Sequence, residues 1–163
     1  MLDGITIYNP YHLGGLFSTF NTDAIKEADF HAGGFPARYG GRMGSILNVI
    51  NREGNTEEFQ GKVNISLLSA KGLIEGPIKW NGMKGSYMLA GRRTYFDVVA
   101  NTLIKASGGS GKVPYYFYDF QGKVNLDINE KHRLTYSQFY GDDVLSIKGD
   151  GSSSFSENND ESG

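Results

Sequence analysis

The sequence predicts a mainly β fold, and three observations support that prediction. Tyr and Phe, which favour strands, occur 10 times each. Glycine occurs 23 times in 163 residues, which disfavours long helices and favours turns. Between about residues 59 and 147, apolar and polar side chains alternate with the two-residue period of a β-strand. A chain of this length holds one compact domain or parts of two.

The first 55 residues predict short elements separated by turns. In chain order these are a strand over 2–8, an aromatic and glycine-rich loop over 8–20, a helix over 23–28, a strand over 28–32, a glycine-rich segment over 33–44 and a strand over 45–51. The helix is expected because Asn21 or Thr22 could cap its free amides and Asp23 would lie favourably in its first turn.

Longer alternating strands follow, about five of them. They are expected over 61–68, 72–79, 84–93, 115–128 and 133–147. Asn81-Gly82 marks a tight hairpin, and residues 95–105 predict a small amphipathic helix. In the fourth strand, one face carries Tyr116, Tyr118, Phe120, Val124 and Leu126, and the other carries Asp119, Gln121, Lys123 and Asn125.

The connections between these strands are asymmetric. Short turns over 80–83 and 129–131 fall at one end of the predicted sheet, whereas the longer segments 94–113 and 148–163 fall at the other. This is the plan of an outer-membrane β-barrel, in which lipid-facing and lumen-facing residues alternate along each strand. No run approaches the roughly 20 apolar residues of a transmembrane helix.

Charge and composition disfavour several other functions. Sixteen basic residues stand against 18 acidic ones, so no overall positive field attracts nucleic acid. Cysteine is absent, which removes thiolate ligands and Cys nucleophiles. His12, His31 and His132 lie far apart and lack metal-binding spacing. We therefore predict no nucleic-acid binding, no metal, no other cofactor and no enzymatic activity.

Several motifs occur in a recognisable order. They are Leu2-Asp3-Gly4, then Gly33-Gly34-Phe35-Pro36-Ala37-Arg38-Tyr39-Gly40-Gly41-Arg42, then Ile46-Leu47-Asn48-Val49-Ile50-Asn51, and later Gly76-Pro77 and Gly91-Arg92-Arg93-Thr94-Tyr95. This set resembles the second half of the plug domain of TonB-dependent outer-membrane receptors, followed by the first strands of their barrel. The resemblance implies a partial α+β plug over 1–55, about five antiparallel strands of an incomplete transmembrane β-barrel over 56–148, and an extracellular loop over 149–163.

The family resemblance also implies a function. Such a receptor holds its plug inside an outer-membrane barrel of about 22 strands, surrounded by lipid. It takes up a scarce extracellular nutrient, such as a siderophore, a glycan or cobalamin, with energy delivered by TonB. Because about five strands cannot close a barrel, we expect a piece of a longer receptor that neither inserts nor transports alone. The alternative is a soluble all-β carbohydrate-binding module, which would bury its apolar rows between two sheets.

Two sets of residues are candidate sites. In the loop over 8–20, Tyr8, Asn9, Tyr11 and His12 would meet the ligand, because flat rings with polar tips suit sugars or chelates. The alternative is that these side chains pack against the plug or the barrel. In the glycine-rich motif, Arg38 and Arg42 would pair with carboxylates of the barrel wall, the alternative being a solvated turn. The motif comprises Gly33, Gly34, Pro36, Arg38, Tyr39, Gly40, Gly41 and Arg42.

Overall fold

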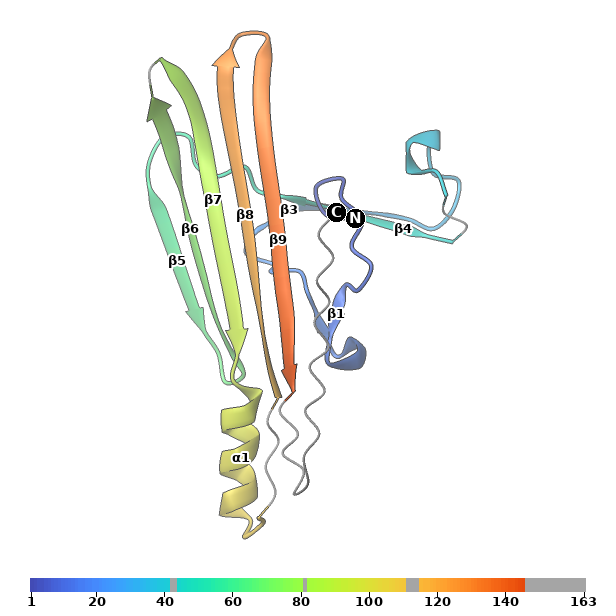
Figure 1. The fold of residues 1–163 in the computed structure, drawn as a ribbon, viewed down its shortest axis with the longest axis vertical. Helices are drawn as coiled ribbons and strands as arrows, with labels where there is room; N and C mark the ends of the chain where they lie inside the picture. The colour runs from blue at the N-terminus through green and yellow to red at the C-terminus, as the bar shows by residue number, and fades with distance from the viewer. Residues whose placement is uncertain (42–43, 81, 111–114, 146–163) are drawn as a thin grey trace, which may run out of the picture.

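The structure is a computed structural model that describes residues 1–41, 44–80, 82–110 and 115–145. It contains a long five-stranded antiparallel sheet and one α-helix that continues from the end of a strand. The residues before the sheet, 1–41 and 44–55, form short elements that lie against one face of the sheet, and we call them the N-terminal segment (Figure 1). The prediction of a mainly β fold is confirmed.

The five strands of the sheet are consecutive in the sequence, in the order β5-β6-β7-β8-β9. Their bounds are Gln60–Ile65 for β5, Ser69–Trp80 for β6, Met83–Thr94 for β7, Tyr115–Asn129 for β8 and His132–Leu145 for β9. Each strand pairs antiparallel with the next. All five strands therefore lie where the alternation of the sequence predicts them.

Helix α1, Phe96–Ala106, follows β7 directly and confirms the helix expected over 95–105. Asp97 in its first turn and Lys105 in its last turn both complement the helix dipole. The helix ends where Gly108 takes a φ of +77° and its amide donates to the carbonyl of Lys105. None of the helices in the described ranges is long and apolar enough to cross a membrane.

The N-terminal segment forms two small hairpins. Strand β1, Tyr11–His12, pairs with β2, Phe17–Ser18, around the 3-10 turn Leu13–Gly15. Strand β3, Ile25–His31, pairs with β4, Ile46–Asn51, and a second 3-10 turn, Ala37–Tyr39, lies between them in the sequence. The chain start runs beside β4, where the amide of Val49 donates to the carbonyl of Met1 at 2.9 Å.

Two predicted elements of this segment are wrong. No strand forms over residues 2–8. Residues 2–5 form a tight turn, because Asp3 and Gly4 take φ values of +48° and +88° and bring Leu2 into a bridge with Ile5, and residues 6–8 are irregular. The helix over 23–28 is replaced by the start of β3. Asn21 accepts a hydrogen bond from the amide of Asp23 at 3.1 Å, which closes a turn, and pairing with β4 then keeps the chain extended.

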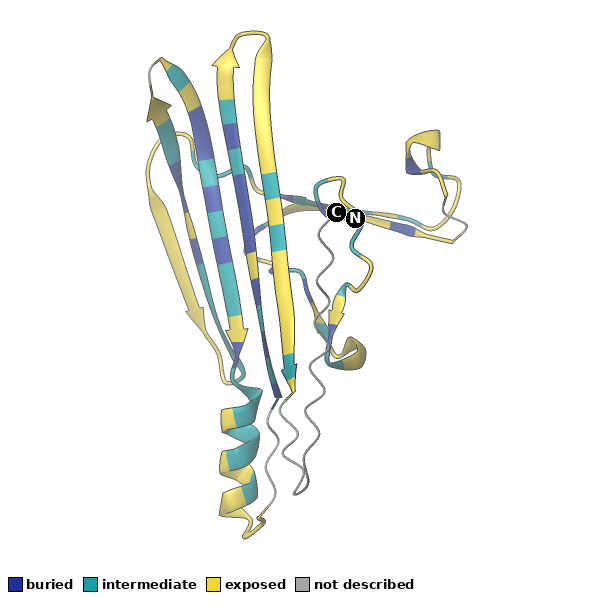
Figure 2. Cartoon of the chain, in the orientation of Figure 1, coloured by how far each residue is buried: buried dark blue, intermediate teal, exposed yellow. Residues whose placement is uncertain are grey.

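The two faces of the sheet differ sharply in burial. We call the face toward the N-terminal segment the inner face and the opposite one the outer face. Figure 2 shows buried and more exposed residues alternating along β7 and β8. On β8 the inner residues Asp119, Gln121, Lys123 and Asn125 are all 5% exposed or less, whereas Phe120 on the outer face is 49% exposed. The predicted alternation of the two rows is present.

Apolar residues dominate the outer face, and they are not covered. Its most exposed members include Val63, Ile65, Ile74, Trp80, Phe120, Ile128, Leu134, Tyr136 and Tyr140. The buried apolar core is small and lies on the inner side, where Leu73, Met88 and Ala90 meet Ala24 of the N-terminal segment. Most of what the inner face buries is polar, which makes the contact with the N-terminal segment the candidate site.

Candidate functional site

Lys123 on β8 anchors the start of the chain to the inner face. Its ammonium lies 2.8 Å from a carboxylate oxygen of Asp3 and donates to the carbonyl of Asn51 at 3.1 Å. The second Asp3 oxygen accepts a hydrogen bond from Ser137 on β9 at 2.6 Å, and the amide of Asn51 donates to the first at 3.0 Å. This one carboxylate therefore ties together the chain start, β4 and two strands of the sheet.

The environment of Asp3 sets its protonation. Burial alone would raise the pKa of this carboxyl group. The hydrogen bonds from Lys123, Ser137 and Asn51, together with the charge of Lys123, outweigh burial and hold the pKa of Asp3 below its usual value. The contact is thus an ion pair in which both oxygens of the Asp3 carboxylate accept hydrogen bonds, the arrangement that a buried charge requires.

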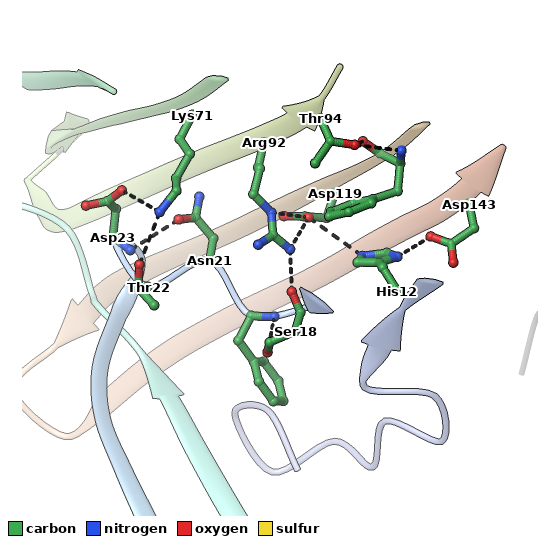
Figure 3. A network of polar contacts seen from close by, with 12 residues as sticks. His12, Ser18, Asn21, Thr22, Asp23, Lys71, Arg92, Thr94, Asp119 and Asp143 are labelled. Carbon is green, nitrogen blue, oxygen red and sulfur yellow. Dashed lines mark hydrogen bonds and ion pairs between the residues drawn. The ribbon is translucent and has the colours of Figure 1, made fainter. Parts of the chain in front are cut away.

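Arg92 on β7 forms a second anchor, at the end of the sheet where α1 begins. Its guanidinium binds a carboxylate oxygen of Asp119 on β8 at 2.6 Å and donates to the main-chain oxygen of Ser18 at 2.6 Å (Figure 3). Asp119 is 2% exposed, so this charge pair is taken out of water. Arg92 therefore joins the first hairpin of the N-terminal segment to the two central strands.

His12 on β1 contacts the same Asp119 carboxylate and also reaches β9. Its Nδ1 hydrogen bonds to Asp143 on β9, its Nε2 lies 3.8 Å from the Asp119 carboxylate, and its ring stacks on Phe117 with centroids 4.0 Å apart (Figure 3). Asp143 also accepts the amide of Leu13 at 3.4 Å. Leu13 has a φ of +50°, a conformation that side-chain-bearing residues rarely adopt. Asp143 therefore holds a strained turn in place.

Asp23 forms a third anchor, on the first strands of the sheet. Its carboxylate lies 2.5 Å from the ammonium of Lys62 on β5 and 3.6 Å from that of Lys71 on β6. The hydrogen bond from Lys62 is the main cause that lowers the pKa of Asp23, the two lysine charges add to it, and burial opposes it.

The segment after β4 makes a close backbone approach to the sheet. The carbonyl of Glu53 accepts hydrogen bonds from Ser86 on β7 at 2.6 Å and from Asn125 on β8 at 3.2 Å. Gly54 follows with a φ of +90°, and a Cβ placed there would lie 2.2 Å from the carbonyl oxygen of Tyr87. Only glycine fits this position.

The predicted ligand-contact residues separate into two groups. Tyr8 is 87% exposed and Tyr11 55% exposed, and Asn9 is exposed as well. His12 instead is 3% exposed and is engaged with Asp143 and Phe117, so it holds the loop to the sheet and is covered from solvent. Contact of Tyr8, Asn9 and Tyr11 with a ligand stays a prediction.

The glycine-rich motif lies between β3 and β4. Gly33, Gly34 and Gly41 take positive φ values, whereas Gly40 and Pro36 do not. The guanidinium of Arg38 lies over the ring of Tyr39, 4.8 Å from its centre, and Tyr39 is buried beside His31. Arg42 lies outside the described residues. Pairing of Arg38 and Arg42 with a barrel wall stays a prediction.

Sequence reasoning missed most of the anchoring residues. It placed Asp119 and Lys123 on the polar row of their strand, but it gave no partner to either. Asp3 lies 120 residues before Lys123, and His12 lies 131 residues before Asp143. The sequence pattern shows a polar row on one face of the strand and an apolar row on the other. This pattern indicates that polar groups or water must meet the polar row, but it does not identify them.

Comparison with known proteins does not assign the chain to a family. No protein-family model matches the chain, and no significant match is found among curated proteins or solved structures.

Proposed function

We propose that this chain is part of a TonB-dependent outer-membrane receptor that takes up an extracellular nutrient with energy supplied through TonB. Residues 1–55 would be the later part of the plug, and residues 56–148 would be the first strands of the barrel. The role is transport and not catalysis. The ordered motifs of the first 55 residues suggest the family, and the structure supplies an independent argument from burial.

The observation that carries the proposal is the inverted burial of the sheet. A water-soluble sheet exposes its polar face and buries its apolar one. Here Asp119, Gln121 and Lys123 are buried against the N-terminal segment, whereas Phe120, Tyr136 and other apolar residues are exposed. A barrel wall has this arrangement, with lipid outside and a polar lumen inside.

The polar contact with the N-terminal segment supports a plug that can move. Ion pairs such as Asp3 with Lys123 and Arg92 with Asp119 fix a position but add little net stability, because removing charges from water offsets their attraction. A contact built from such pairs is specific and can be rearranged. A continuous apolar core would resist the pull that TonB is proposed to exert.

The open edges of the sheet favour a larger assembly. Within the described residues, β5 and β9 are the edge strands, and each pairs on one side. Unpaired backbone groups cost several kcal/mol each in lipid, so a membrane sheet must close into a barrel. The remaining strands would come from the longer receptor. Its ligand, whether a siderophore, a glycan or cobalamin, would be met by the exposed Tyr8 and Tyr11.

Fractionation of the source cells tests the proposal. An antibody raised against residues 33–41 is used to probe soluble, inner-membrane and outer-membrane fractions. We expect a band several times heavier than 17.9 kDa in the outer membrane. A soluble band of 17.9 kDa would contradict the proposal and favour an all-β carbohydrate-binding module, in which a second sheet covers the apolar face.

A further inference from the structure

Neighbouring arginines at the end of β7 point to opposite faces of the sheet. Arg92 lies on the inner face, bound to Asp119 and Ser18. Arg93 lies on the outer face and is exposed, with its guanidinium carbon 5.0 Å from the centre of the Tyr116 ring. The ring supports the cation from one side by a cation–π contact and leaves its other side open.

Among the described residues, the formally charged side chains of the outer face lie near the end of the sheet where α1 begins. They are Arg93 and Asp142; Gln138 and, at the opposite end, His132 are polar, and most of the other outer residues of β5 to β9 are apolar, aromatic or glycine. Arg93 and Asp142 lie in register with Tyr118 between them. Tyr116 lies one outer position nearer that end of the sheet and Tyr140 one outer position farther from it, and such rings are typical of a membrane boundary.

The nearby carboxylate does not neutralise Arg93. Asp142 is two strands away, about 10 Å at the usual spacing of strands. Its carboxylate accepts a hydrogen bond from the hydroxyl of Tyr118 at 3.2 Å. Within the described part of the chain, the ion pairs do not include Arg93. The guanidinium therefore presents donors toward the space beside the outer face.

We propose that Arg93 binds the phosphate group of an anionic membrane lipid at this boundary. The inference rests on the proposed function, because the outer face must meet lipid. A guanidinium offers two parallel donors that match two phosphate oxygens, and the exposed position lets it do so without losing an internal partner. Tyr116 holds the side chain at the level of the headgroups.

The test compares lipid retention by two variants of the full chain. The chain is held in neutral maltoside micelles and titrated with phosphatidylglycerol or with phosphatidylcholine, and bound lipid is measured by native mass spectrometry. Arg93→Gln should lower the affinity for phosphatidylglycerol about fivefold, the effect of one basic residue near an anionic surface. Lys131→Gln removes the same charge from the turn at the opposite end and should leave the affinity unchanged. Inorganic phosphate should not displace the lipid.

The outcomes separate this inference from the proposed function. Equal retention of phosphatidylglycerol by the native chain and Arg93→Gln would overturn the lipid site and leave the apolar outer face in contact with micelles. Displacement by inorganic phosphate at equal concentration would overturn it in favour of a free anion. A chain that stays dispersed without detergent and takes up neither lipid would overturn the membrane contact and the lipid site together.

Discussion

Nearby residues of strand β8 show how the two faces of the sheet differ. On the inner face Lys123 is polar and 5% exposed, whereas on the outer face Phe120 is apolar and 49% exposed. The inner face is held by directed contacts with the N-terminal segment, each of which can be removed by one substitution. The outer face offers mostly apolar area, whose stabilisation depends on what covers it. The stability of this chain therefore has two parts: polar contacts within the chain, and an apolar face whose contribution depends on its surroundings.

The largest effect is expected from breaking the Lys123 anchor. Lys123→Gln leaves the Asp3 carboxylate without its charged partner, and such a loss costs about 3–5 kcal/mol. Urea unfolding of the chain in micelles, followed by circular dichroism, would measure the change. Adding Asp3→Asn to the variant should recover part of the loss, since the uncompensated charge is then gone. A cost below about 1 kcal/mol for the single variant would show that this pair does not hold the segment.

The next effect is steric and lies in the segment after β4. Gly54→Ala would place a Cβ 2.2 Å from the oxygen of Tyr87, at a φ of +90°. Strain and the forced shift together should destabilise the fold by about 3 kcal/mol. Gly82→Ala is the matched control, because Gly82 has a φ of +82° and nothing within 4 Å. Equal losses of stability in the two variants would contradict the close backbone approach.

A smaller effect is expected where two adjacent aspartates point to opposite faces. Asp143→Asn weakens the bonds to His12 and Leu13, so the loop over 8–18 should open more readily, at a cost of about 1 kcal/mol. Asp142→Asn makes the same change on the outer face. Hydrogen exchange of peptides from that loop should quicken in the first variant only. Equal exchange in both would remove Asp143 from the anchor.

The smallest effect is the acid dependence of single carboxylates. The pKa values of Asp3 and Asp23 are lowered in the folded chain. Their stabilisation is therefore complete above the unfolded pKa, about 4, and is lost as the pH falls through the lower folded values. Docking of the N-terminal segment, followed by hydrogen exchange, should weaken below about pH 4. Asp3→Asn should make docking of the segment less dependent on pH. An unchanged acid profile in that variant would show that Asp3 does not contribute to the acid sensitivity.

How far the sequence predicts the structure differs between the two regions. The strands of the sheet follow from alternation alone, because residues such as Asp119 and Phe120 report their faces locally. The N-terminal segment does not, because β3 is extended by pairing with β4, some 20 residues later, and that pairing overrides the helix signals around Asp23. The anchors were also beyond local reasoning, since Asp3 and Lys123 meet only in the folded chain.

The central claim is that the outer face contacts lipid while the inner face holds the N-terminal segment. The chain has no cysteine, so single cysteines can carry spin labels at Phe120→Cys, Gln121→Cys and Val124→Cys. Collision rates with oxygen and with a water-soluble nickel complex are then measured on the chain held in neutral maltoside micelles, because five strands alone are not expected to insert into a membrane. We predict high oxygen and low nickel access at 120 and 124, and low access to both at 121. High nickel access at 120 and 124, or shielding from both reagents there, would contradict the account.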